Sequence, residues 1–300
     1  MSGALERRYE LLLRCYPAAY RAEHGAEIVG TLLAAAEPGR RVPPLREAAA
    51  LVREGLTARA RRTVEGPVPW WADGLHLGVL VLAVVHLVHA FADIVLQGRS
   101  AWAWVAASVA LVLALLRGKV WLALPLALAV ALTVSRSMLF GPEATSSLGL
   151  NQATVHHSWV SLTPYWLMAA GTMALAARRS RDLRVRSWWW VAVPAATVGA
   201  DALLGIELYS GLGSLGRAGL EGGLLLAGIW LTWATRSPRW ALAAALYVLP
   251  GELSTLVNLS WTGGSTVVAA YWAVLAGLLL AMAATAVRGR AHGAGSGQER

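Results

Sequence analysis

The sequence is poor in charge, in lysine and in cysteine, and each shortage narrows what the chain can be. Only 14% of its 300 residues are charged, while 57% are hydrophobic, and soluble domains carry roughly 25% charged residues. The single cysteine, Cys15, excludes an internal disulfide and any zinc site built from cysteines. Lys119 is the one lysine among 26 basic residues, a bias typical of GC-rich bacterial genomes. The composition therefore predicts a bacterial membrane protein.

Motifs that bind nucleotides or activate a nucleophile are also missing. There is no GxGxxG after a predicted strand, no Walker lysine motif and no GxSxG elbow. The glycine-rich stretch "GLGSLG" at 211–216 falls in a predicted loop, without the strand and helix that a phosphate site needs. The chain starts with charged, amphipathic sequence, so we expect no cleavable signal peptide. We predict that the protein is not an enzyme and uses no cofactor.

Residues 1–65 hold much of the charge and predict a small domain of three helices. Apolar residues recur at helical spacing in each helix, Pro17 breaks the first from the second, and Pro43 and Pro44 open the third. The side chains expected to face inward are Leu5, Tyr9, Leu12, Tyr16, Ile28, Val29, Leu32, Leu33, Leu45, Val52 and Leu56. About 60 residues is marginal for an isolated core, so this domain is expected to lean on the membrane part or on a partner.

From Trp70 onward the chain is almost continuously apolar. A membrane span needs about 20 apolar residues, and the pattern predicts eight. They cover residues 74–97, 101–117, 120–141, 158–177, 187–208, 218–235, 240–260 and 265–287. Residues 66–73 would be an interfacial linker, 74–287 the bundle and 288–300 a disordered cytoplasmic tail. The predicted fold class is all-α: a polytopic transmembrane helix bundle with a small N-terminal cytoplasmic three-helix domain.

The basic residues predict the orientation of these spans. Cytoplasmic loops are enriched in Lys and Arg. With both termini inside, the inner segments are 117–119, 178–186, 236–239 and the tail, and every one of them is basic. Arg99 and Arg217 are the only basic residues in the predicted outer loops. We therefore predict a multi-pass protein of the bacterial cytoplasmic membrane with its N- and C-termini in the cytoplasm.

The ionisable residues inside the spans gather in their outer halves. Buried charge in a membrane is costly, and it normally faces the bundle interior with a partner. Arg136 is the one basic residue within the predicted spans and cannot neutralise all the acids. We therefore predict an outer polar pocket that binds a ligand or an ion; the alternative is one structural ion pair with the other groups reaching the headgroups. The candidate residues are Asp93, Arg136, Asp201, Glu207, Glu221, Glu252, His86 and His89.

Three local motifs leave alternatives open. Pro250-Gly251 before Glu252 is read as a proline kink, or as an unwound segment that holds a transporter substrate. Gly219 and Gly223 would let another helix approach closely. A metal site is a minor alternative, and no metal is predicted. Its ligands would be His86, His89, His156 and His157.

The most specific stretch of the chain is "LERRYELLLRCYPAAYRAEHGAEIVGTLL", residues 5–33. It resembles the permease prefix domain of some bacterial ABC-type permeases and the related HAAS-type signalling domains, found in multi-pass proteins of bacteria, among them actinobacteria. The resemblance covers about 60 residues and none of the spans. It implies a cytoplasmic adaptor that meets a transcription regulator of the PadR family or an ATPase. The residues that carry it are Leu12, Tyr16, Pro17, Tyr20, Arg21, Gly25, Glu27 and Ile28.

These observations favour a membrane sensor or signalling protein, whose outer pocket is coupled to the N-terminal domain. A small-solute or lipid transporter, or a permease subunit, is the second hypothesis, and a membrane-embedded enzyme is the third. The expected partners are the lipid bilayer and a cytoplasmic regulator or ATPase bound through residues 1–65. Direct binding of nucleic acid is not expected, because arginines beside a membrane more often meet anionic lipid. The pattern does not predict an oligomeric state.

Overall fold

The computed structural model describes residues 3–37, 39–63, 68–97, 102–140, 159–178, 183–204, 211–257 and 266–295. Over these residues the chain is helical and contains no strand, which confirms the all-α class. Contacts between Cα atoms divide the chain into two compact units, Met1–Pro67 and Val68–Arg300.

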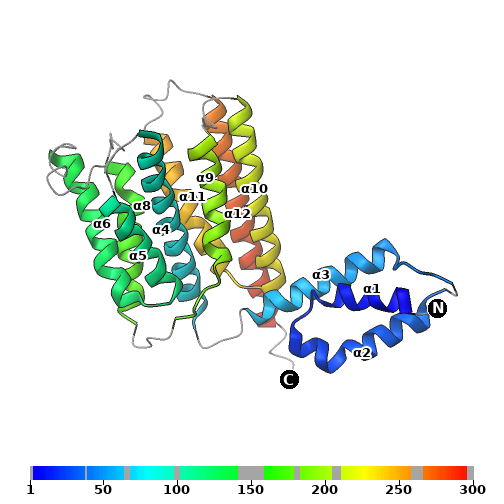
Figure 1. The fold of residues 1–300 in the computed structure, drawn as a ribbon. Coiled ribbons are helices and arrows are strands. Elements are labelled where there is room, and N and C mark those ends of the chain that lie inside the picture. Colours follow the sequence, from blue (N-terminus) through cyan, green and yellow to red (C-terminus); the bar gives the residue numbers. More distant parts are fainter. Residues whose placement is uncertain are drawn as a thin grey trace. The chain divides into compact units, whose positions relative to one another are not determined.

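The first unit is formed by three helices. They are α1 (Gly3–Leu13), α2 (Ala18–Ala35) and α3 (Leu45–Arg62), and α1 lies between the other two (Figure 1). Proline has no N–H to continue a preceding turn, and α2 and α3 start directly after Pro17 and Pro44. The core of the unit consists of Leu5, Tyr9, Leu13, Tyr16 and Val29. Tyr9 is fully buried, and its hydroxyl donates a hydrogen bond of 2.9 Å to Glu47 Oε2 on α3.

The third helix packs through a face that the apolar pattern does not predict. Leu45 and Leu56 are 86% and 42% exposed, so the prediction that they face inward is wrong. Gly55 lies against the end of α1 instead: a Cβ there would be 2.8 Å from Tyr16 Cδ2 and 2.9 Å from Cys15 Cβ. Because this glycine brings α3 close to α1, the helix is rotated and the two leucines are left outside.

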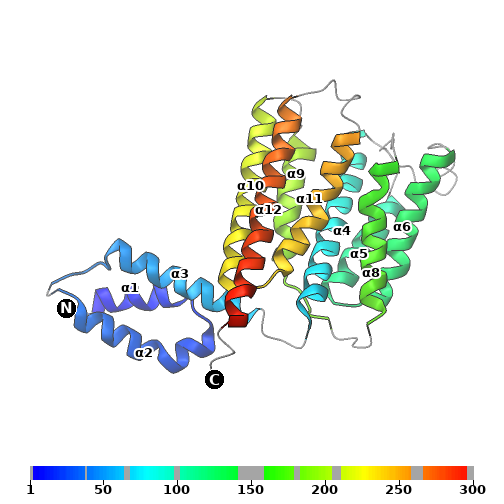
Figure 2. The same cartoon turned by 180° about the vertical axis from the view of Figure 1, so that it is seen from behind.

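The second unit is a bundle of helices that run roughly side by side. They are α4 (Trp70–Gln97), α5 (Trp102–Leu116), α6 (Val120–Phe140), α8 (Thr163–Ala176), α9 (Trp189–Leu204), α10 (Gly211–Thr235), α11 (Arg239–Val257) and α12 (Thr266–Gly295), with one 3-10 turn at Trp159–Leu162. Helix α4 contacts α5, α8, α9 and α11 and so forms the centre of the bundle, while α12 packs against α10 and α11 (Figure 2).

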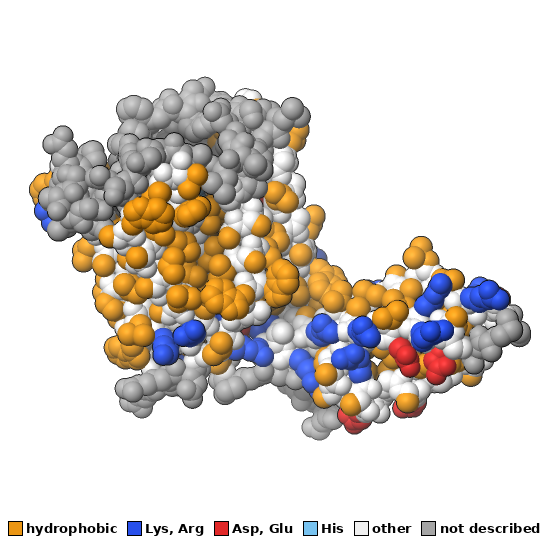
Figure 3. All heavy atoms as spheres, in the orientation of Figure 1, with side chains coloured by type: hydrophobic (Ala, Val, Ile, Leu, Met, Phe, Trp, Pro, Cys, Tyr) orange, Lys and Arg blue, Asp and Glu red, His pale blue; other side chains and the backbone are white. Residues whose placement is uncertain are grey.

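Among the residues that the structure describes, three helical segments are long and apolar enough to cross a membrane. They are Trp70–Ala92, Val120–Phe140 and Thr266–Arg288, and two shorter apolar helices cover Trp102–Leu116 and Trp189–Gly199. Hydrophobic side chains cover much of the bundle face in Figure 3, with Lys and Arg side chains toward one end. These features fit a membrane protein, and the count of eight spans and the orientation stay predictions.

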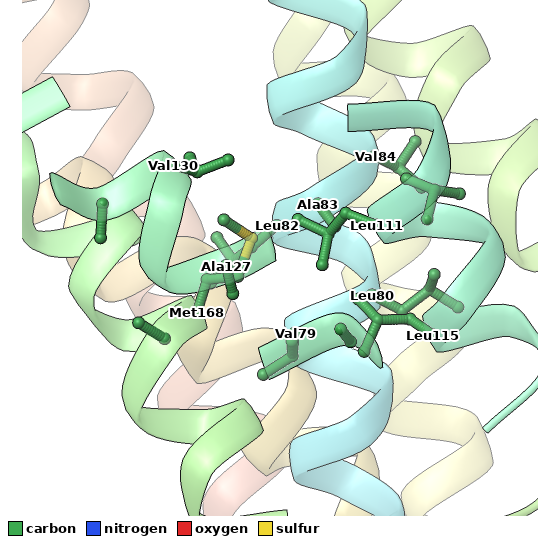
Figure 4. Close-up of a cluster of buried hydrophobic side chains, with 14 of the residues drawn as sticks. Val79, Leu80, Leu82, Ala83, Val84, Leu111, Leu115, Ala127, Val130 and Met168 are labelled. Carbon is green, nitrogen blue, oxygen red and sulfur yellow. The ribbon is translucent and has the colours of Figure 1, made fainter. Parts of the chain in front are cut away.

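The apolar core of the bundle lies where α4, α5, α6 and α8 meet. The side chains that Figure 4 labels point toward one another from these four helices. They include Leu80 on α4, Leu111 and Leu115 on α5, Val130 on α6 and Met168 on α8, all almost fully buried. This half of the bundle is therefore densely packed by aliphatic side chains.

Glycines fix the contact between α4 and α11. A Cβ on Gly74 would lie 2.7 Å from the carbonyl oxygen of Arg239, and a Cβ on Gly78 would lie 2.4 Å from Leu246 Cδ1. These glycines are four residues apart and form the small-xxx-small pattern that allows close helix approach in membranes. No atom lies within 4 Å of a Cβ built on Gly219 or Gly223. The prediction that those two glycines mark the close approach is therefore wrong.

Candidate functional site

Glu221 is the candidate residue whose surroundings are best defined. It lies on α10, is 5% exposed, and accepts hydrogen bonds from three side chains. Arg217 Nε and the Tyr247 hydroxyl donate to Oε1, at 2.9 and 2.8 Å, and the Tyr271 hydroxyl donates to Oε2. The Arg217 guanidinium also lies over the Tyr271 ring, 5.6 Å from its centroid. One carboxylate thus joins α10, α11 and α12.

Arg217 corrects the predicted charge balance. The glycine-rich stretch before it was expected to be an outer loop, which left Arg136 as the one basic residue within the spans. Instead, α10 begins at Gly211, so Arg217 lies on the helix four residues before Glu221 and on the same face. The acid is neutralised within its own helix and needs no distant arginine.

A mostly apolar pocket of about 340 Å³ lies beside this carboxylate. Its walls come from α4, α9, α10, α11 and α12, and Glu221, Tyr247 and Thr197 supply polar groups. Three lining residues that are themselves well exposed, Trp189, Val193 and Leu224, belong to α9 and α10. The pocket therefore opens sideways between α9 and α10, on the surface that lipid would cover if these helices span the membrane.

Two stacked tryptophans close another part of the pocket. Trp190 on α9 and Trp240 on α11 both line it, and their ring centroids are 5.6 Å apart at an interplanar angle of 26°. Arginine side chains cover both rings: Arg239 lies 4.4 Å from the centroid of Trp240, and Arg186 lies 5.8 Å from that of Trp190. The tryptophan pair thus separates the pocket from two guanidinium groups.

The two arginines share one buried acid, Asp73 in the first turn of α4. Arg186 Nη2 lies 2.6 Å from Asp73 Oδ1 and also donates to the Asp73 carbonyl oxygen at 2.8 Å. Arg239 Nη1 lies 2.8 Å from Asp73 Oδ2. The three side chains are 10% exposed or less. Asp73 therefore connects the starts of α4 and α11 with the segment that leads into α9.

Burial and ion pairing act in opposite directions on these arginines. Desolvation is the larger effect and lowers the pKa of Arg186 and of Arg239. The charge and hydrogen bonds of Asp73 oppose this shift in part. Arginine stays protonated in proteins, so the cluster has one negative and two positive charges. Stacking on the tryptophans stabilises this surplus cation, because the face of an aromatic ring is electron-rich.

His76, one turn after Asp73, ties α5 to the same end of the bundle. It is fully buried, and its Nε2 lies 2.8 Å from the carbonyl oxygen of Leu115. The Arg186 backbone N–H donates to the carbonyl oxygen of Leu116 at 2.8 Å. Both carbonyls belong to the last turn of α5, where the Leu115 carbonyl oxygen also accepts from the Gly118 N–H at 2.9 Å. The sequence interpretation missed Asp73, His76, Arg186 and Arg239. The sequence feature that could have identified these residues is a single polar or charged residue directly before, or at the start of, a long apolar run.

The predicted histidine pair is split between two environments. His86 and His89 were expected to share one face of α4. His86 is buried between the rings of Trp104 and Tyr165, with centroid distances of 5.1 and 5.5 Å, whereas His89 is exposed and its Nδ1 lies 2.9 Å from the Val85 carbonyl oxygen. The expectation that they line one site is therefore wrong.

The remaining candidates do not form one described pocket. Arg136 is exposed on α6, and α6 packs against neither α10 nor α11. Glu252 on α11 is partly buried, and its Oε1 has no hydrogen-bond partner among the described residues. The backbone is helical through Pro250-Gly251, so the unwound segment is not observed. The side chains of Asp93 and Asp201, and the whole of Glu207, His156 and His157, lie outside the described part.

Over the described residues, no group of three or more His, Cys, Asp or Glu side chains could hold a metal ion. A comparison with known protein families, with curated protein sequences and with solved structures finds no match for this chain. The site geometry alone therefore supports the function proposed below.

Proposed function

We propose that this protein is an integral membrane sensor of an amphiphilic small molecule. The observation that carries the proposal is the apolar pocket between α9 and α10 with one buried carboxylate, Glu221, at its wall. Its volume lies in the range of small-molecule sites, which are mostly apolar with a few placed polar groups. A sideways opening suits a ligand that arrives from the bilayer.

The donors around Glu221 define the polar end of the ligand. An ionised carboxylate has about four acceptor positions, and three are occupied by Arg217, Tyr247 and Tyr271. One further donor can approach the remaining position, and an ionised carboxylate head has no donor to offer there. The ligand class is therefore an alkyl or isoprenoid chain with a hydroxyl or ammonium head.

Transmission would run through the tryptophan pair. A ligand in the pocket contacts Trp190 and Trp240, whose rings carry the two arginines that hold Asp73. Asp73 lies in the first turn of α4, near the start of the second unit. A ligand that prefers one arrangement of the tryptophans would bias the position of this turn. In this proposal residues 1–65 act as the cytoplasmic adaptor, in keeping with their resemblance to permease prefix and HAAS-type domains, and bind a regulator or an ATPase.

The pocket is tested with three photoactivatable probes that share one alkyl chain and end in an amine, an alcohol or a carboxylate. In proteoliposomes the amine and alcohol should label peptides of α9 and α10, and the carboxylate should label them several-fold less. Ala227→Trp fills the pocket at an exposed position and should abolish labelling, while Ala283→Trp, exposed on α12 outside the pocket, should not. The proposal is refuted if the wild type, Ala227→Trp and Ala283→Trp are labelled equally.

A transporter is the second candidate, because Glu252 keeps a buried carboxylate oxygen without a hydrogen-bond partner in the described residues. Such an oxygen could take up a proton during a transport cycle. Purified protein in liposomes should then move solute or protons without any partner, and Glu252→Gln should stop this flux. Flux that is independent of a partner would end the sensor proposal.

A further inference from the structure

A second pocket, of about 370 Å³, lies away from the first, at the turn between α5 and α6. Arg117 and Lys119 lie in this turn, and Arg178 follows the end of α8. All three cations line the pocket, and none of the described residues that line it is acidic. None of the three forms a salt bridge with a described carboxylate. Within the described part of the chain, the pocket therefore gathers three positive charges that no carboxylate balances.

Two further features favour an anion in this pocket: the N-terminus of α6 and a buried nitrogen of Arg178. Lys119, Val120 and Trp121, at the start of the 21-residue helix α6, line the pocket, and the dipole of a helix places a partial positive charge at its N-terminus. Arg178 Nη1 is buried and has no hydrogen-bond partner among the described residues. A buried guanidinium nitrogen without an acceptor is costly, so Arg178 has a donor that an acceptor beyond the described residues, such as a ligand, can use.

The wall of this pocket is held in place by backbone contacts. Gly118 ends α5 with a φ of +69°, a conformation that favours glycine, and a Cβ on it would lie 2.8 Å from the carbonyl oxygen of Leu183. The Lys119 N–H donates to the Ala114 carbonyl oxygen at 2.8 Å, which closes the turn. The cations thus stand on a turn with a fixed geometry, which suits a specific ligand better than a diffuse charge.

The surroundings select a lipid over a free anion. Trp121 and Leu122 line the pocket and are 59% and 58% exposed, and exposed tryptophan is typical of the membrane–water interface. The Arg178 guanidinium lies over Trp71, another exposed tryptophan, 5.7 Å from the ring centroid. Apolar side chains therefore border the cations where acyl chains would continue from a headgroup.

We propose that this pocket binds the phosphate group of an anionic phospholipid, with Arg117, Lys119 and Arg178 as the cationic ligands and the dipole of α6 adding positive potential. The site is independent of the pocket beside Glu221 and of the proposed sensing function. Basic pockets between helices on the cytoplasmic side of membrane proteins are suited to anionic headgroups. The bound lipid would fix the α5–α6 turn against the end of α8.

The test uses the full chain in nanodiscs of phosphatidylcholine with one fifth phosphatidylglycerol, and then native mass spectrometry of lipids kept after detergent extraction. Wild-type protein should retain phosphatidylglycerol over phosphatidylcholine. Lys119→Gln and Arg178→Gln should each lower this preference about five-fold, as expected for the loss of one basic residue near a charged surface. Arg178→Lys keeps the charge and should keep most of the preference.

Arg184→Gln is the matched control, because it removes the same charge from the neighbouring segment without touching the pocket. Its lipid retention should equal that of the wild type, and all variants should elute as monodisperse protein. The proposal is overturned if the wild type shows no preference, or if Lys119→Gln and Arg178→Gln retain as much phosphatidylglycerol as Arg184→Gln. If inorganic phosphate binds in pure phosphatidylcholine nanodiscs and displaces the lipid at millimolar concentration, the site is one for a free anion and the lipid proposal is also overturned.

Discussion

Asp73 and Glu221 are both buried carboxylates bound to arginine, yet they stabilise the fold in different ways. Asp73 binds Arg186 and Arg239, which are 113 and 166 residues away in the chain, whereas Arg217 is four residues from Glu221. Asp73 is a cross-link between distant helix starts, and Glu221 is a local ion pair that two tyrosines extend to other helices. A buried ion pair can therefore hold distant helices together or form part of a local site, depending on how far apart its partners are in the chain.

Asp73→Asn should have the largest effect on stability if Asp73 cross-links distant helix starts. This substitution keeps the shape but removes the negative charge that Asp73 supplies to two buried guanidinium groups, and breaking a buried ion pair in this way costs about 3–5 kcal/mol. The loss should appear as a lower free energy of unfolding in SDS titrations of mixed micelles. Arg136→Gln, at an exposed position, should change stability by no more than about 0.5 kcal/mol. A loss below about 1 kcal/mol for Asp73→Asn would contradict the cross-link role, because it is the range of an exposed pair.

Glu221→Gln should cost less, about 1–3 kcal/mol. The amide oxygen introduced by this substitution would still accept from one tyrosine, and the amide NH2 could donate to the hydroxyl oxygen of the other. Arg217, which is 19% exposed at its side chain, can turn outward. Adding Arg217→Gln to this variant should cost little more, because the two substitutions remove one interaction. The same titration measures all three proteins. Strict additivity of the two single losses would show that Arg217 and Glu221 do not act as a pair.

Tyr247→Phe should have a smaller effect, about 1 kcal/mol, since it removes one of three hydrogen bonds to Glu221 and leaves the ring in place. It should also weaken labelling by the amine probe less than Glu221→Gln does. If Tyr247→Phe lowers stability or labelling more than Glu221→Gln does, the Tyr247 hydroxyl and not the Glu221 carboxylate is the main polar group of the site.

An effect of similar size is expected in the first unit, where the Tyr9 hydroxyl donates a hydrogen bond to Glu47. Burial, then the hydrogen bond to Glu47, raises the pKa of Tyr9 above its ordinary value of 10.0. The folded form therefore keeps its proton longer than the unfolded form, so this stabilisation is complete below pH 10 and is lost as the pH rises further. The rate at which iodoacetamide labels Cys15 should increase above pH 10 beyond what thiol ionisation explains.

In Tyr9→Phe this alkaline increase should be smaller. The part that stays comes from Tyr16, whose pKa burial also raises. At neutral pH the Tyr9→Phe variant should label about five-fold faster, the equivalent of one lost hydrogen bond of about 1 kcal/mol. An unchanged alkaline profile in this variant would show that Tyr9 does not control the opening of the unit.

Apolar runs and prolines were enough to predict the helices, because both act locally. The all-α class is confirmed, and the apolar stretch after Trp70 contains three helices long enough for a membrane. The start of α10 was missed because glycine has a low helix propensity in water. The structure nevertheless starts α10 at Gly211, so that "GLGSLG" is helical and Arg217 lies on the same helix as Glu221.

The site was predictable only where its parts are close in the chain. Glu221 was singled out as a charge in an apolar run, and the structure buries it. Its tyrosine partners are 26 and 50 residues away, and no spacing in the sequence brings them together. The face of α3 was misjudged for a related reason: apolar periodicity cannot reveal that the small Gly55, packed against Tyr16, decides which side of the helix approaches α1.

The glycines of α4 also restrict how the bundle can move. Because a Cβ on Gly74 would lie 2.7 Å from the Arg239 carbonyl oxygen, α4 and α11 touch there backbone to backbone, beside the Asp73–Arg239 pair. Sliding either helix along the other would collide main-chain atoms and stretch the ion pair together. The first turn of α4 and the start of α11 consequently form one rigid unit, and a displacement of the Asp73 turn must carry the start of α11 with it.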